Sequence, residues 1–127
     1  MNGYESQMRR LLRLLLATGF IAAGVLHFVR PRAFVRIVPE WLPAPERLVA
    51  ISGLAEVLGG VGLLVPATRP VARFGLASLL VAVFPANVEM LVHRDRAGGG
   101  LPPWLLAARL PVQPLLVAAV LATKEEA

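Results

Sequence analysis

Residues 51–66 read ISGLAEVLGGVGLLVP, an apolar run of helix length with one carboxylate, Glu56, close to its middle. An ionisable side chain at the centre of such a run is costly in a hydrocarbon environment, so other segments must supply polar partners for it. The rest of the chain offers few candidates for that role. They are His27, Asn87, Arg109 and Gln113.

The composition is typical of a membrane protein. Of the 127 residues 57% are hydrophobic, and the mean hydropathy is +0.68, whereas apolar residues make up about half of a typical soluble domain. A chain of this length has room for one domain, residues 1–127, made mostly of spanning segments. The net charge of +5 does not indicate nucleic-acid binding, because the arginines lie singly or in pairs at the ends of apolar segments, where interfacial anchors belong.

Four apolar segments have the length needed to cross a membrane. They lie at about residues 11–29, 47–65, 71–92 and 103–123. Because short turns join the last three, we expect an all-α integral membrane four-helix bundle with antiparallel, up-and-down topology. Small residues four apart mark two faces that we expect to pack closely. These faces hold Gly19, Ala23 and His27 on the first segment and Ser52, Glu56 and Gly60 on the second.

The connection between the first two segments is the longest, and it is rich in proline. Residues 30–46 read RPRAFVRIVPEWLPAPE; the prolines rule out a long helix, yet the apolar content is high for a free loop. Two interpretations remain open. The segment lies on the membrane surface with Trp41 at the level of the lipid headgroups, or it is a packed loop that caps the bundle.

Several further features bear on the chemistry. The chain has no cysteine, which excludes disulfides, thiol redox relays and thiolate metal sites. We expect no metal site, since too few imidazole and carboxylate ligands fall at one depth. Glu89 lies near a helix end, and we expect it to be solvated or paired with Arg94. In the last segment Pro111 and Pro114 each free a carbonyl, which needs an internal partner inside a membrane.

An up-and-down bundle places the polar candidates in the same half of the membrane. At about 1.5 Å per residue, His27 lies a few residues below the face that carries the long connection. Asn87 and Arg109 lie somewhat deeper, and Glu56 and Gln113 lie near the midplane. Four separate segments therefore bring polar groups to a common region.

This cluster has two interpretations. In the structural one, Arg109 pairs with Glu56 and Gln113, and the cluster fixes the register of the bundle. In the functional one, the cluster heads a pocket for a small ligand such as a quinone ring or a lipid head. His27 and Glu56 would then exchange protons, Arg109 would donate to an anion or carbonyl, and Asn87 and Gln113 would orient the ligand.

Five stretches, in this order, resemble the DoxX family of small four-helix membrane proteins. They are GVLHFVRPRAF, WLPAPERLV, SGLAEVLGGVGLLVP, VFPANVEM and RLPVQPLL, and the similarity covers about residues 11–120. The resemblance implies cytoplasmic termini in the plasma (inner) membrane, with the Trp41 loop outside; charge alone does not decide this, because basic residues are divided equally between the two faces. It also implies that the matching polar residues are His27, Glu56, Asn87, Arg109 and Gln113.

The function that we expect is that of a small-ligand-binding or accessory membrane component. Named DoxX relatives are similar to subunits of a thiosulfate:quinone oxidoreductase or work beside membrane redox enzymes, so a quinone is the cofactor that the resemblance implies. One alternative is a quinone-linked oxidoreductase subunit. Another is a purely structural subunit that associates with a membrane redox partner or with copies of itself.

Overall fold

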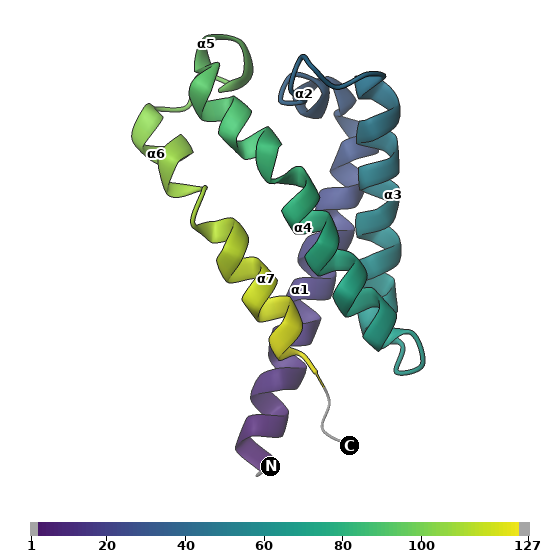
Figure 1. Cartoon of the computed structure of the whole chain (residues 1–127). Coiled ribbons are helices and arrows are strands. Elements are labelled where there is room, and N and C mark those ends of the chain that lie inside the picture. Colours follow the sequence, from purple (N-terminus) through teal and green to yellow (C-terminus); the bar gives the residue numbers. More distant parts are fainter. Residues whose placement is uncertain (1–2, 125–127) are drawn as a thin grey trace.

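The computed structural model describes residues 3–124, and these fold into helices joined by short connections, with no strand among them. Four helical segments of the described chain are long and apolar enough to cross a membrane, which confirms the predicted all-α class. The helices in chain order are α1 (Gly3–Val29), α2 (Pro31–Val35), α3 (Pro45–Leu64), α4 (Arg69–Val92), α5 (Arg94–Ala97), α6 (Pro103–Ala108) and α7 (Val112–Ala122) (Figure 1).

The first helix begins well before the apolar run. It starts at Gly3 rather than at residue 11, and its first turn contains Glu5, whose charge favours a helix N-terminus. The guanidinium of Arg9 donates a hydrogen bond of 2.8 Å to the carbonyl oxygen of Lys124. The polar extension of α1 is therefore tied to the chain just beyond α7, close to where α7 ends (Figure 1).

The predicted fourth helix is divided in two, which corrects the expectation of one helix over residues 103–123. Pro111 has no N–H and cannot continue the ladder, so α6 ends at Ala108 and α7 begins at Val112. The carbonyls that the two prolines free are paired locally. Leu110 N–H donates to Ala107 O at 3.1 Å, and Gln113 N–H donates to Leu110 O at 3.3 Å.

Glycines allow α1 and α3 to pack with their backbones almost in contact. A Cβ atom at Gly24 would lie 2.6 Å from the carbonyl oxygen of Gly53, and one at Gly53 would lie 2.6 Å from Cβ of His27. A Cβ at Gly60 would meet Ile21 at 2.7 Å. Gly19 differs from the prediction, because a Cβ there meets nothing within 4 Å. The close contact thus fixes His27 against α3, while Gly19 borders open space.

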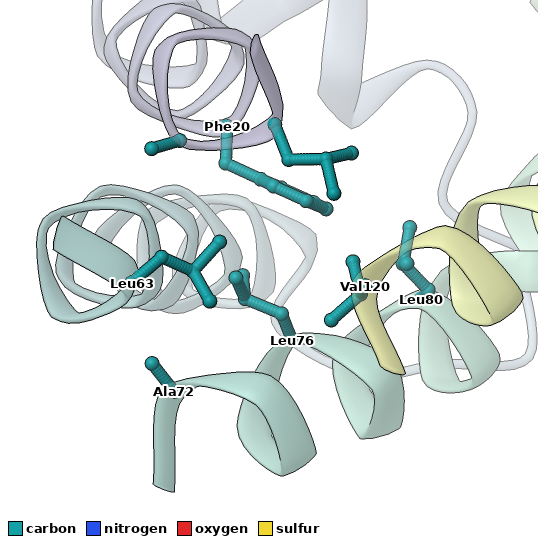
Figure 2. Close-up of a cluster of buried hydrophobic side chains, with 8 residues drawn as sticks. Phe20, Leu63, Ala72, Leu76, Leu80 and Val120 are labelled. Carbon is teal, nitrogen blue, oxygen red and sulfur yellow. The ribbon is translucent and has the colours of Figure 1, made fainter. Parts of the chain in front are cut away.

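The apolar core lies in the half of the bundle where α1 begins and α7 ends. It consists of side chains from α1, α3, α4 and α7 that meet between the helices (Figure 2). Its buried members are Leu16, Ala17, Phe20, Leu63, Ala72, Leu76, Leu80 and Val120. Toward α2, α5 and α6 the pair formed by α4 and α6–α7 diverges from the pair formed by α1 and α3 (Figure 1). The helices therefore pack closely around the apolar core at one end of the bundle and lie farther apart at the other end (Figure 1).

Candidate functional site

A cleft of about 660 Å³ occupies the open half of the bundle. Its walls come from α1, α2, α3, α4 and α7 and from the connection after α2, and most of the lining side chains are apolar. All five predicted polar residues line this one cleft. They are His27, Glu56, Asn87, Arg109 and Gln113.

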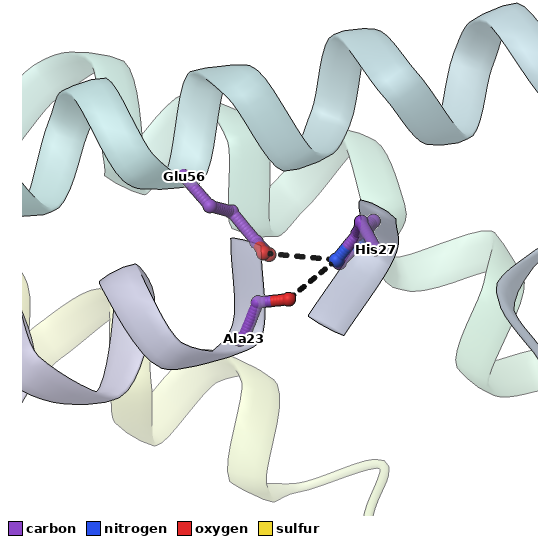
Figure 3. Close-up of polar contacts among 3 residues, drawn as sticks. All are labelled: Ala23, His27 and Glu56. Atoms are coloured by element: carbon purple, nitrogen blue, oxygen red, sulfur yellow. Dashed lines mark hydrogen bonds and ion pairs between the residues drawn. The ribbon is translucent and has the colours of Figure 1, made fainter. Parts of the chain in front are cut away.

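His27 and Glu56 form the polar centre of the α1–α3 wall. The Nδ1 atom of His27 lies 2.7 Å from the carbonyl oxygen of Ala23 and 3.4 Å from Oε2 of Glu56 (Figure 3). Both side chains are buried, with 8% of His27 and 9% of Glu56 exposed. The distance to Glu56 is within the range of an ion pair, but Oε2 has no hydrogen-bond partner among residues 3–124. The short contact to Ala23 therefore satisfies Nδ1 and leaves the carboxylate incompletely partnered.

Phe34 orients the imidazole from the side of the connection. The two rings stack with their centroids 3.8 Å apart and their planes inclined by 22°. Phe34 and several apolar residues after it, among them Ile37 and Leu42, line the cleft, whereas Trp41 is 73% exposed. The proline-rich connection thus packs over the cleft and leaves the Trp41 side chain exposed.

Arg109 and Gln113 are placed on the opposite wall by the break between α6 and α7. Gln113 Nε2 donates to the carbonyl oxygen of Leu80 at 2.9 Å, which joins α7 to α4. Arg109 Nη1 lies 3.2 Å from Sδ of Met90, also on α4. A thioether is a weak acceptor, so most of the donor capacity of this guanidinium is left for other groups.

The predicted pairing of Arg109 with Glu56 is wrong. Glu56 faces His27, on the neighbouring helix α1, and Arg109 turns toward Met90 on α4. The physical reason is the interruption at Pro111, because a residue at the end of a short helix does not point where it would in a continuous α-helix. The two opposite charges therefore lie on different walls of the same cleft.

A second acid–imidazole pair was missed. Glu89 is buried, and its Oε1 lies 2.8 Å from Nδ1 of His93, the C-cap residue one turn later that follows α4. This corrects the expectation that Glu89 is solvated or paired with Arg94; the guanidinium of Arg94 donates instead to the carbonyl of Leu91 at 3.2 Å. The spacing of four residues between Glu89 and His93 was the available signal, since such side chains share one helix face.

The donor set of the cleft suits an organic ligand better than a metal ion. Over the described residues no group of three or more histidine, aspartate or glutamate side chains is placed to hold a metal. The α1–α3 wall offers acceptors, namely the Glu56 carboxylate and an imidazole nitrogen of His27, whereas the facing wall offers the donors of Arg109 and Gln113. A ligand whose polar head both donates and accepts hydrogen bonds would pair with the groups on both walls.

A family model described as a domain of unknown function, DUF8561, matches residues 16–124. The chain belongs to the DUF8561 family. The region that the family model covers begins within α1 and includes the five predicted polar residues that line the cleft. No curated protein and no solved structure matches this DUF8561 protein. Its function must therefore be argued from the cleft itself.

Proposed function

We propose that this DUF8561 protein is an integral membrane protein that holds a lipophilic small molecule with a polar head, a quinone in particular, in the cleft between its helices. It acts as a binding or accessory component of its membrane. The observation that carries the proposal is the Glu56 carboxylate, which lines an otherwise apolar cleft and whose Oε2 has no hydrogen-bond partner among residues 3–124.

Burial of such a carboxylate is costly unless something pairs with it. Isolated charges in an apolar environment are strongly destabilising, and proteins keep them where they serve a site. His27 offers incomplete compensation, because its Nδ1 is closer to Ala23 O, at 2.7 Å, than to Glu56, at 3.4 Å. A ligand that brings a polar head to this wall would supply the missing interaction.

The size and lining of the cleft suit a ring with an apolar tail. Ligand pockets commonly measure about 300–1,000 Å³, and the cleft measures about 660 Å³. Toward the core the lining consists of apolar side chains from α1 and α7, such as Leu15 and Leu116. The head would lie among the polar residues and the tail along these helices.

The placement in the membrane is part of the proposal. Trp41 precedes α3 and Trp104 opens α6, and they are 73% and 71% exposed. Both belong to the end of the bundle that carries α2 and α6 (Figure 1), and exposed tryptophans are typical of the membrane–water interface. Together with the resemblance to DoxX, this supports an up-and-down bundle in the plasma membrane with cytoplasmic termini and the Trp41 loop outside.

A thermal unfolding experiment with a short-tailed benzoquinone tests the proposal. We expect the quinone to raise the melting temperature of the detergent-solubilised protein, because a ligand that binds only the folded state stabilises it. Gly19→Leu should abolish this shift, since Gly19 lines the cleft and a side chain there meets nothing within 4 Å.

Gly75→Leu is the matched control. A Cβ at Gly75 also meets nothing within 4 Å, but Gly75 is exposed and does not line the cleft. This variant should keep the full shift. Equal shifts in the two variants would place the quinone outside the cleft, and no shift in the unmodified protein would reject the quinone as its ligand.

A further inference from the structure

We infer that the cleft prefers a head that donates a hydroxyl hydrogen, and hence binds a hydroquinone more tightly than the corresponding quinone. This inference rests on the proposed function and specifies which form of the ligand the site recognises. It follows from the hydrogen-bond roles of the polar groups on the α1–α3 wall.

The contact between His27 and Ala23 determines where the imidazole carries its hydrogen. A carbonyl oxygen only accepts hydrogen bonds, so the 2.7 Å contact means that Nδ1 is the donor. In the neutral imidazole the lone pair then lies on Nε2. Stacking on Phe34 holds the ring in this orientation. His27 lines the cleft, so the nitrogen left for a ligand is an acceptor.

Glu56 adds a second acceptor beside the first. Its Oε2 lies 3.4 Å from the same Nδ1–H that Ala23 uses, and it has no hydrogen-bond partner in the described part of the chain. A carboxyl group accepts hydrogen bonds through its oxygens whether or not it carries a proton. The Ser52 hydroxyl, one turn before Glu56 on α3, also lines this wall and can donate one hydrogen. With His27 Nε2 and the two Glu56 oxygens, the acceptors of the α1–α3 wall still outnumber its available donors.

The facing wall, formed by α4 and the segment around Pro111, supplies hydrogen-bond donors. The Arg109 guanidinium has only donors and lies against the weak acceptor Met90, and the Gln113 amide donates one hydrogen to Leu80. A hydroquinone satisfies both walls, because one hydroxyl donates to His27 or Glu56 and the oxygen of the other accepts from Arg109 or Gln113. A quinone carries only carbonyl oxygens and has no hydrogen to donate. It would therefore shield the acceptors of the α1–α3 wall from water without forming hydrogen bonds to them.

The experiment compares two matched pairs of ligands. The first pair is a short-tailed benzoquinone and its hydroquinone, both measured by calorimetric titration under anaerobic conditions. The second pair is a 4-alkylphenol and its methyl ether, which differ in one hydroxyl hydrogen and have no quinone chemistry. We expect the hydroxyl-bearing member of each pair to bind about tenfold more tightly, which is the usual effect of leaving a buried polar group unpaired.

Glu56→Gln tests the assignment of the acceptor. The amide keeps the shape of the side chain but introduces N–H donors, so the preference for the hydroquinone should fall several-fold or reverse. Ser78→Ala, on the exposed face of α4, should leave the ratio unchanged. Equal affinities within both pairs, or tighter binding of the quinone and the ether, would overturn the inference while leaving the proposed function intact. Failure of every ligand to bind would reject the proposed function itself.

Discussion

Glu56→Leu is expected to raise the melting temperature of the ligand-free protein and to abolish ligand binding. The carboxylate is 9% exposed, and its Oε2 lacks a hydrogen-bond partner within residues 3–124. Replacing this side chain by leucine removes an unsatisfied buried acceptor, while His27 Nδ1 keeps its 2.7 Å contact with Ala23 O, so the protein should gain about 1–3 kcal/mol of stability. Thermal unfolding of both proteins in the same detergent, with and without the quinone, measures the two effects.

Glu89→Leu provides the contrast for this prediction. Glu89 is equally buried, but its Oε1 lies 2.8 Å from Nδ1 of His93. Leucine would lose this short contact with His93, whose side chain is 54% exposed, so this variant should lose about 1 kcal/mol of stability. The two substitutions should therefore change stability in opposite directions. Glu56 serves the site at a cost in stability, whereas Glu89 stabilises the fold. If Glu56→Leu destabilised the protein as much as Glu89→Leu, then the contact between His27 and Glu56 would be structural.

Gly53→Ala is expected to lower the free energy of unfolding by about 1–3 kcal/mol, the usual cost of forcing an extra group into close-packed surroundings. The added methyl group would lie 2.6 Å from Cβ of His27 and 3.0 Å from the carbonyl oxygen of Gly24. Neither α1 nor His27 can move aside without separating the imidazole from Glu56. Ligand affinity should therefore fall together with stability, as measured by thermal unfolding and titration.

Gly75→Ala is the control for backbone effects. It makes the same substitution within a helix, at a position where a Cβ meets nothing within 4 Å. Because alanine favours a helix over glycine by about 1 kcal/mol, this variant should be as stable as the unmodified protein or slightly more so. Equal behaviour of the two variants would show that the approach of α1 to α3 is not tight.

Hydropathy and proline positions predict most of the fold. The four apolar segments identify the four helical segments that are long and apolar enough to cross a membrane. The boundaries are less predictable where polar side chains find tertiary partners. Arg9 reaches Lys124 and extends α1 to Gly3, and no local pattern shows this contact. The two prolines also differ in their effect on the helix that contains them. Helix α4 continues through Pro85, whereas Pro111 lies between α6 and α7.

The predicted polar residues do line one cleft, but the contacts that they make there could not be predicted. Counting residues along each segment gives an expected depth in a membrane, and that depth groups the five predicted polar side chains, all of which line the cleft. Depth does not give the direction in which a side chain points. Arg109 therefore faces Met90 rather than Glu56, and the stacking of Phe34 on His27 depends on a connection whose path no periodicity defines.

Native mass spectrometry of the protein, extracted gently from its own membrane, is the most direct test of the central claim that the cleft holds a lipophilic ligand. We predict a bound quinone in near-stoichiometric amount in the unmodified protein and in Gly75→Leu, and its loss in Gly19→Leu. Retention of a phospholipid alone would assign the cleft to a lipid head. A bundle that carries no small molecule in any of the three proteins would contradict the account and leave the polar cluster as a device for packing the helices.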